Sequence, residues 1–183
     1  MFAVTPRLLL RPGWPEDAPA LCAAINDEAI VRNLARAPWP YRLDDARQFL
    51  SLPDDLSHPR WLIFTRTDGP PQLAGCIGID SKDHGEVELG YWISRPHWGR
   101  GYATEAGRAV LRNVRTLGHK RLVASHFVDN PASGSVLRKL GFQPTGRTTG
   151  LFSRGRNSDV QAVEFSCLLE DEQQGDAMRP LAA

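Results

Sequence analysis

The chain has 183 residues, of which 42% are hydrophobic and 23% are charged, and its formal net charge is +1. A chain of this length is expected to form one domain with a sizeable core, and the near-neutral charge argues against nucleic acid or an anionic membrane as a partner. Its apolar runs fall well short of the ~20 residues that span a bilayer and of a signal-peptide core, so we expect a cytoplasmic protein.

The first half of the chain is predicted to contain short helices followed by strands. Pro15, Glu16 and Asp17 indicate a helix start, because proline and acidic residues favour the first turn. The predicted strands are apolar runs separated by turn-forming residues. In chain order we predict a strand, three helices and three antiparallel strands over residues 7–11, 15–25, 28–34, 44–50, 61–65, 73–79 and 86–93.

The second half is predicted to alternate helices and strands. A helix over 104–117 carries Ala106 and Val110 on one apolar stripe, at the spacing of an amphipathic helix. Asn130 and Pro131 indicate another helix start, because Asn is a good N-cap and proline suits the first helical position. The remaining segments are strands over 121–127, 142–146 and 159–169 and a loop over 146–158. This order predicts a mixed α/β sheet with helices on both faces.

A glycine-rich segment, Trp98-Gly99-Arg100-Gly101-Tyr102-Ala103-Thr104-Glu105, joins the strand at 86–93 to the helix that follows. A strand, a Gly-x-Gly loop and a helix start together favour anion binding. The glycines let backbone N–H groups approach a phosphate, and the helix N-terminus adds about half a positive charge. A Gly-x-Gly sequence is also typical of a plain tight turn, so the loop alone leaves both interpretations open.

The cysteines and histidines show no pattern of a disulfide framework or a metal site. The 3 cysteines are far apart and odd in number, which favours a reducing compartment. The 5 histidines lack the spacing of metal ligands. We therefore expect no metal, and we expect no nucleophilic cysteine because no base accompanies one in the sequence.

The segment at 130–142, NPASGSVLRKLGF, resembles the last helix of the GNAT N-acetyltransferases, and its distance from the glycine-rich segment fits that family. Two further stretches, TPRLLLRP at 5–12 and PWPYRLDDARQFL at 38–50, resemble the RimJ/RimL branch of ribosomal-protein N-terminal acetyltransferases and their relatives. The resemblance implies a single GNAT domain over residues 1–170. The residues from about 171 are polar and then small, which predicts a flexible tail over 171–183. It also implies a mostly antiparallel α/β sheet of about seven strands, splayed at the cofactor site, with helices on both faces.

The resemblance implies acetyl-CoA as co-substrate, bound between the strands at 86–93 and 121–127. Backbone N–H groups of the glycine-rich loop would hold the pyrophosphate, and Arg100 would reach a phosphate or lie in solvent. The backbone at 92–94 would pair with the pantetheine arm as an added strand does, and Asn130 would hydrogen-bond it. The implied cofactor-binding residues are Trp92, Ile93, Ser94, Gly99, Arg100, Gly101, Tyr102, Ala103, Thr104 and Asn130.

The sequence departs from the family pattern at two positions. Trp98 stands where the phosphate motif usually begins with Gln or Arg, which removes a side chain but leaves the backbone cradle. Leu137 stands where many GNAT enzymes carry a tyrosine that serves the leaving thiolate. The RimJ/RimL branch instead resembles this chain in carrying a serine three residues after the asparagine, here Ser133.

Glu88 and Ser133 are the candidate catalytic residues. Glu88 matches the carboxylate of the family's cofactor strand and is predicted to act as general base or to orient the acceptor amine; a surface ion pair is the alternative. Ser133 is predicted to donate a hydrogen bond to the departing sulfur, or else to serve only the start of its helix. A backbone N–H near Ile93 is expected to meet the developing oxyanion.

The leading functional hypothesis is acetylation of a protein N-terminus. An α-amine with a pKa of about 7.8 is about one-seventh neutral at pH 7, so a modest base suffices for it. The alternatives are acetylation of a small amine, such as an amino acid, polyamine or aminoglycoside, and a non-catalytic acyl-CoA sensor. Acceptor specificity is expected from the N-terminal helices and the loop at 146–158. The loop arginines Arg147, Arg154 and Arg156 are predicted to be solvated, and attraction of an acidic peptide is the alternative. A homodimer is expected from family behaviour alone.

Overall fold

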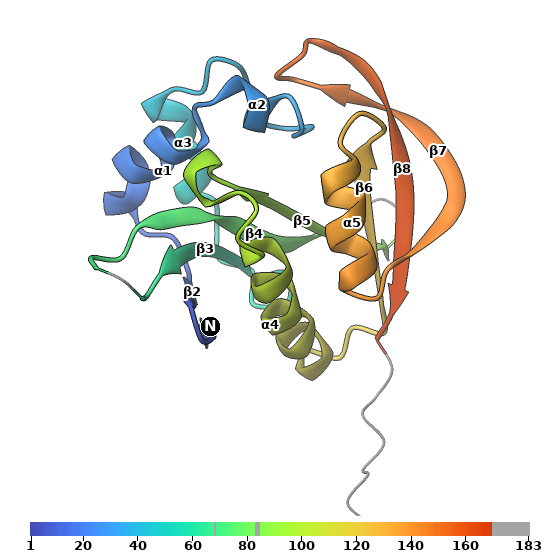
Figure 1. The fold of residues 1–183 in the computed structure, drawn as a ribbon, viewed down its shortest axis with the longest axis horizontal. Helices are drawn as coiled ribbons and strands as arrows, with labels where there is room; N and C mark the ends of the chain where they lie inside the picture. The colour runs from blue at the N-terminus through green and yellow to red at the C-terminus, as the bar shows by residue number, and fades with distance from the viewer. Residues whose placement is uncertain (68, 83–84, 170–183) are drawn as a thin grey trace, which may run out of the picture.

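The computed structural model describes residues 1–67, 69–82 and 85–169, and the predicted tail at 171–183 lies outside these residues. Its strands form one sheet in the order β1-β2-β3-β4-β5-β6-β8-β7 (Figure 1). Every neighbouring pair is antiparallel except β5 and β6, which run parallel. In the described part of the chain, no helix is long and apolar enough to cross a membrane.

Helices and strands follow the predicted order. The strands are β1 Ala3–Val4, β2 Leu8–Arg11, β3 Arg60–Thr65, β4 Leu73–Ser81, β5 Val87–Ile93, β6 Arg121–Phe127, β7 Gln143–Ser153 and β8 Ser158–Leu168. The α-helices are α1 Ala18–Ile25, α2 Glu28–Val31, α3 Leu43–Leu50, α4 Tyr102–Thr116 and α5 Pro131–Lys139. Two short 3₁₀ turns, Pro15–Asp17 and Arg95–His97, precede α1 and follow β5.

The expected mostly antiparallel sheet of about seven strands is confirmed: the described sheet has eight, because Ala3–Val4 adds a short edge strand. One expectation about segment boundaries is wrong. The predicted loop at 146–158 is mostly strand, since β7 continues to Ser153 and β8 begins at Ser158. A register shift between Pro144 and Thr148 lets this long hairpin stay paired. Only the tip at 154–157 connects the two strands.

The two faces of the sheet carry separate hydrophobic clusters. One cluster joins the sheet to α4 and α5 and includes Val110, Leu137 and Phe165. The other joins the opposite face to α1, α2 and α3 and includes Leu21 and Tyr41. In Figure 1 the helices α4 and α5 accordingly lie apart from the group of α1, α2 and α3. We call the face that carries α1–α3 the acceptor face.

The sheet opens between its two parallel strands. β5 pairs with β4 along its full length, whereas β5 and β6 share a single paired position, Glu88 with Val123. Beyond Glu88 the two strands therefore have no ladder bonds to one another. α5 lies close over β6 on one side of this opening: a Cβ at Gly134 would lie 2.6 Å from Nε2 of His126. The opening is thus bordered by β5, β6 and the first turns of α4 and α5.

Candidate active site

Two glycines shape the turn between β5 and α4. Gly99 and Gly101 have φ values of +73° and +77°, in the left-handed region that side chains disfavour. A Cβ at Gly99 would meet nothing within 4 Å, so the space beside this backbone is open. α4 begins at Tyr102, which leaves its first N–H groups and positive dipole end at the turn. A helix N-terminus preceded by left-handed glycines offers backbone N–H groups to an anion.

A partly buried carboxylate, Glu105, ties this turn to the N-terminal segment. Glu105 accepts hydrogen bonds from Thr5 Oγ1 at 2.6 Å and from the Arg7 backbone N–H at 3.0 Å. The Arg7 guanidinium bonds Glu105 Oε2 at 2.7 Å and the Arg100 carbonyl at 3.0 Å. Burial alone would raise the pKa of Glu105, but the bonds from Thr5 and Arg7 hold it below its ordinary value. These bonds between Glu105 and the N-terminal segment were not predicted from the sequence.

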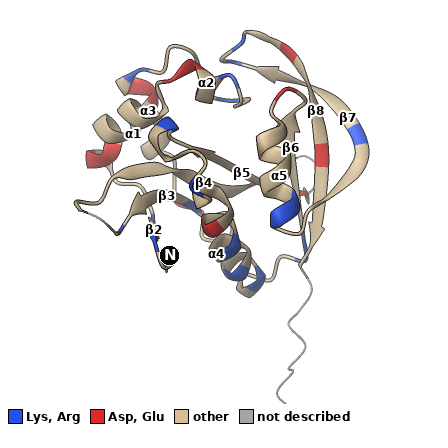
Figure 2. Ribbon diagram, viewed as in Figure 1, with Lys and Arg blue, Asp and Glu red and all other residues tan. Residues whose placement is uncertain are grey.

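A basic groove begins at the same turn and continues along α4. It is lined by Thr104 and Gly101, by Glu105, and by four cationic side chains, Arg7, Arg108, Arg112 and Lys139. Figure 2 shows Lys and Arg along α4 and at the end of α5. Arg108 and Arg112 are four positions apart on α4, so both lie on one side of this helix. Their meeting with Lys139 depends on how α5 packs beside α4.

The backbone at 92–94 has internal partners that limit its use. The Ser94 N–H donates to the Ala74 carbonyl at 2.8 Å, and a Cβ on Gly75 would lie 2.2 Å from the Trp92 carbonyl oxygen. Both groups therefore point toward β4. In an antiparallel ladder alternate residues face opposite edges, so Ile93 is the residue of this trio that faces the opening.

Trp98 folds back onto this residue. Its indole N–H donates to the Ile93 carbonyl at 2.6 Å, while the side chain stays half-exposed. The neighbouring His97 is buried and hydrogen-bonded to Ser94 Oγ at 2.8 Å. Burial, followed by the charge of Arg100, lowers the pKa of His97, which favours its neutral form. The strand end and the phosphate turn are therefore joined by side-chain contacts.

Asn130 and Ser133 lie where the sequence analysis predicted, at the start of α5. Asn130 is the N-cap, and its Oδ1 accepts a hydrogen bond from the Ser133 N–H at 3.4 Å. The Ser133 hydroxyl contacts the hydroxyl of Tyr91 on β5 at 2.7 Å. Asn130 therefore caps the helix through the Ser133 N–H, and the Ser133 hydroxyl is not needed for this cap. No sequence signal pointed to Tyr91, because its partner is 42 residues away.

Glu88 lies at the point where β5 and β6 separate. Its Oε1 accepts a hydrogen bond from Ser125 Oγ at 2.9 Å and lies 3.5 Å from Lys82 Nζ. The side chain is 22% exposed. Glu88 and Tyr91 are three positions apart on one strand, so their side chains leave opposite faces. The carboxylate therefore borders the opening from the acceptor face and the phenol borders it from the α5 face.

Two more carboxylates share the acceptor face with Glu88. Asp80 pairs directly across from Glu88, and Glu164 pairs across from Ser125, the residue that bonds Glu88. Arg36 is ion-paired with Asp80, and Arg147 Nε lies 3.5 Å from Glu164 Oε1. The face is therefore acidic but partly neutralised.

The tip of the β7–β8 hairpin is bound to residues 31–37 across this face. Arg156 forms two bonds to Asp129, at 2.8 and 2.9 Å, and a third to the Arg32 carbonyl at 2.6 Å. Gly155 packs so closely that a Cβ there would lie 2.6 Å from Val31. The prediction that the loop arginines are solvated is wrong for Arg156, whose side chain is 16% exposed. The hairpin tip therefore crosses the acceptor face, and Arg156 holds it at Asp129, which precedes Asn130 in the chain.

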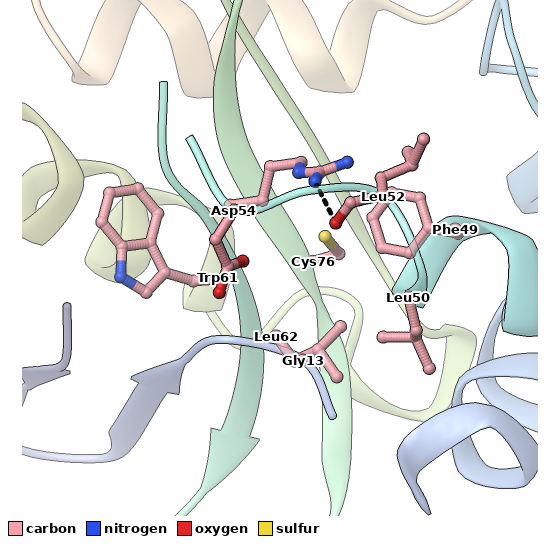
Figure 3. Close-up of a pocket in the computed structure, with 9 residues that line it drawn as sticks. Gly13, Phe49, Leu50, Leu52, Asp54, Trp61, Leu62 and Cys76 are labelled. Atoms are coloured by element: carbon pink, nitrogen blue, oxygen red, sulfur yellow. Dashed lines mark hydrogen bonds between the residues drawn. The ribbon is translucent and has the colours of Figure 1, made fainter. Parts of the chain in front are cut away.

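A separate hollow lies between α3 and strands β3 and β4 (Figure 3). It holds only about 20 Å³ and is lined mainly by apolar side chains, among them Phe49, Leu62 and Cys76. Burial raises the pKa of Cys76 to about 12, so its thiol stays protonated and is a poor nucleophile. No predicted site residue lines this hollow. In the part of the chain that the structure describes, no group of acidic, histidine and cysteine side chains has the form of a metal site.

Comparisons with known proteins identify the family of the chain. Residues 7–143 match the family model of the acetyltransferase (GNAT) domain. The chain is 31% identical over 154 residues to the Bacillus subtilis (strain 168) protein named Uncharacterized N-acetyltransferase YoaA, covering 80% of this chain and 86% of that one.

Two further matches concern ribosomal-protein acetyltransferases. The ribosomal-protein-serine acetyltransferase of Escherichia coli (strain K12) is 35% identical over 57 residues, which is 31% of this chain and 32% of that one. The structure of RimL, described as a ribosomal alpha-N-protein acetyltransferase in complex with coenzyme A, aligns with a TM-score of 0.75 at 20% identity, covering 92% and 98% of the two chains. This last likeness concerns the fold.

Proposed function

Because the chain belongs to the GNAT N-acetyltransferase family, we propose that it transfers the acetyl group of acetyl-CoA to the N-terminal α-amine of a protein or peptide. The observation that carries the proposal is the opening of the sheet directly beyond Glu88, where β5 and β6 stop pairing. The opening is bordered by a carboxylate on one face and by a hydroxyl pair on the other. The carboxylate can therefore assist the acceptor amine from one face, while the hydroxyl pair assists the leaving group from the other.

The described residues fit the charged end of acetyl-CoA. The left-handed glycines leave backbone space open at the start of α4, as a pyrophosphate needs. The basic groove lined by Arg108, Arg112 and Lys139 continues from that turn and supplies cations for further phosphate. Pairing of the pantetheine arm with the sheet falls to Ile93 rather than to Trp92 or Ser94. Its carbonyl becomes available when the Trp98 indole turns away.

Acetyl-CoA supplies an activated thioester. In the transfer the amine nitrogen bonds to the carbonyl carbon, the carbon–sulfur bond breaks to release the CoA thiolate, and one proton leaves the nitrogen. Glu88 is the group that receives this proton, directly or through a water. Ser125 holds its carboxylate in place. Ser133 donates a hydrogen bond toward the sulfur, and the backbone N–H of Ile93 faces the developing oxyanion.

Two arguments favour an α-amine over a lysine side chain. At pH 7 about one α-amine in seven is neutral, against roughly one lysine in a few thousand, so an α-amine needs less help from a carboxylate base. The bridge from Arg156 to Asp129 and Arg32 also spans the acceptor face, which favours an acceptor that enters end first. The names of the ribosomal-protein acetyltransferases among the similar proteins point the same way.

One observation favours a small cationic amine as the second candidate acceptor. Asp80, Glu88 and Glu164 lie on one face of neighbouring strands, where they would attract a polyamine or an aminoglycoside. The partners Arg36 and Arg147 reduce that attraction. A non-catalytic acyl-CoA sensor is the third candidate, and it requires no role for Glu88.

The test is CoA release from acetyl-CoA with two panels, one of short peptides that differ in their first residue and one of small amines. The proposal expects turnover on peptides with a free N-terminus and none on the same peptides blocked at that amine. Turnover confined to small amines would support the second candidate. Binding of acetyl-CoA without turnover on either panel, and unchanged by Glu88→Gln, would support the sensor.

A further inference from the structure

The phenol of Tyr91 ends against Ser133. Its hydroxyl lies 2.7 Å from Ser133 Oγ and donates to the Ser133 carbonyl at 3.1 Å. Tyr91 belongs to β5 and Ser133 to the first turn of α5, so the contact spans the opening of the sheet. The phenol is largely buried, and this burial raises its pKa to about 12, while the bond with Ser133 lowers it. Tyr91 is therefore a neutral donor near pH 7.

The surroundings of Ser133 leave its hydroxyl free for a role outside the helix. Asn130 already accepts the Ser133 N–H. The neighbouring Gly134 packs against His126, which fixes the first turn of α5 on β6. Leu137, at the position where many family members carry a tyrosine, is 1% exposed in the main core and cannot donate a proton. The phenol that borders this opening comes from the strand.

The hydroxyls of Tyr91 and Ser133 have one proton each, so each can donate one hydrogen bond. When Tyr91 donates to the Ser133 carbonyl, the Ser133 proton can point back to the tyrosine oxygen. When Tyr91 donates to Ser133 Oγ instead, the Ser133 proton is free for a third group. Rotation of one phenol O–H therefore decides whether Ser133 can donate outward. A negative charge near Ser133 favours the second arrangement, because bonds to a charged acceptor are about twice as strong.

We propose that Tyr91 is a positioning residue for Ser133: it donates to Ser133 Oγ and so directs the serine proton toward the departing sulfur of CoA. The inference rests on the proposed function, in which Ser133 serves that sulfur. The pair acts by hydrogen bonding and not by proton transfer. A thiol with an ordinary pKa of about 8.5 is a far stronger acid than this phenol, so its thiolate does not remove the phenol proton.

The direct test is the thiol pKa of CoA bound to the protein, measured by titrating the ultraviolet absorbance of the thiolate. This measurement needs no acceptor amine. The proposal expects bound CoA to ionise at a pH about one unit below free CoA, because a hydrogen bond to a charged group is worth about tenfold or more in ionisation. Tyr91→Phe and Ser133→Ala should each bring the thiol back toward its free value.

A double-mutant cycle tests the dependence of one hydroxyl on the other. With any active acceptor, Tyr91→Phe should lower kcat about tenfold and leave KM for acetyl-CoA within about twofold. In the Ser133→Ala background the same change should have almost no effect. Ser135→Ala is the matched control. In the described part of the chain, the Ser135 hydroxyl on the same helix donates to the Pro131 carbonyl. This variant should leave both readouts unchanged.

The outcomes separate this inference from the proposed function. A lowered thiol pKa that depends on Tyr91, in a protein that acetylates neither panel, would overturn the proposed acceptor and support the inference. If turnover is normal and Tyr91→Phe changes neither the thiol pKa of bound CoA nor kcat, the inference is overturned and the proposed function stands. Thermal unfolding of the variants shows whether the fold persists. If Tyr91→Phe unfolds the protein, Ser133→Ala alone must still raise the thiol pKa, and failure to do so overturns the inference.

Discussion

The proposed cofactor side and the proposed acceptor side of this molecule are built in different ways. Most of the proposed cofactor side, from β5 through the turn at 94–101 to the start of α4, is one continuous stretch of chain, to which Arg7, Lys139 and the start of α5 are added. The acceptor side joins residues 31–37, Asp129 and the tip at 154–157, and its ties connect residues up to 124 positions apart. A continuous stretch can be read from a sequence motif, whereas a site assembled from distant segments cannot.

This difference predicts separate effects on the two substrates. Changes on the cofactor side should alter the affinity for acetyl-CoA and leave the choice of acceptor intact. Changes on the acceptor side should alter KM for the acceptor and leave cofactor binding intact. Glu88 lies where the two sides meet, so the largest effect is expected there.

Glu88→Gln should lower kcat/KM for the acceptor at least about a hundredfold, because it removes the proposed general base while keeping the shape of the side chain. Glu86→Gln is the matched control: Glu86 occupies the same face two positions earlier and is ion-paired with Arg121 at the surface. Steady-state kinetics with both variants make the comparison. Equal losses in the two variants would show that charge on this face, and not the position of Glu88, matters.

Gly101→Ala should weaken acetyl-CoA binding about tenfold, since a left-handed conformation costs a residue with a Cβ about 1–2 kcal/mol and distorts the turn. Gly118→Ala is the matched control, because Gly118 also has a positive φ and its Cβ would meet nothing within 4 Å. Calorimetry should show similar stability losses in both and a loss of acetyl-CoA affinity only in Gly101→Ala. Equal affinities would remove the turn from the cofactor site.

Arg156→Ala should raise KM for the acceptor roughly fivefold, the equivalent of about 1 kcal/mol, because the hairpin tip loses its bonds to Asp129 and Arg32. Arg154→Ala is the control, since the Arg154 guanidinium has a single contact at 3.4 Å with the Arg36 carbonyl. Acceptor kinetics and acetyl-CoA binding are measured together. A shift in acetyl-CoA affinity with unchanged acceptor KM would contradict the division into two sides.

The smallest expected effect is a pH dependence of stability from Glu105. Its pKa lies below the ordinary value of 4.5 in the folded protein, so the unfolded chain takes up the proton first as the pH falls. The stabilisation is fully present above about pH 4.5 and is lost as the pH falls through the lowered folded pKa. Urea unfolding at a series of pH values should show a shallower acid loss in Glu105→Gln than in the wild type. Asp129→Asn should change the slope less, because Asp129 is more exposed.

Local patterns predicted much of the fold. The strand at 121–127 and the helix begun by Asn130 and Pro131 were found where expected, because an apolar run and a capping pair act within a few residues. The turn at Gly99 and Gly101 was likewise predicted from the local sequence. The length of β7 was not, since its exposed polar residues look like loop until they pair with β8.

The site was predicted less completely than the fold. Position along the family motifs indicated Glu88, Ser133 and Asn130, but the contacts that support them come from elsewhere. Tyr91 looked like an ordinary apolar strand residue, and its role depends on where α5 packs. Arg156 looked like a solvated loop arginine, and its burial depends on contacts with Asp129 and Arg32. Periodicity and composition contain no information about such distant pairings.

The most direct test of the central claim, that acetyl-CoA occupies the opening between β5 and β6, is an NMR titration of the isotopically labelled protein with acetyl-CoA. We expect the largest amide shifts at Ile93, at residues 99–104 and at the start of α5 around Ser133. The indole N–H of Trp98 should also shift as it leaves the Ile93 carbonyl. Shifts gathered around the hollow between α3 and β3, with the glycine turn unmoved, would contradict this account of the site.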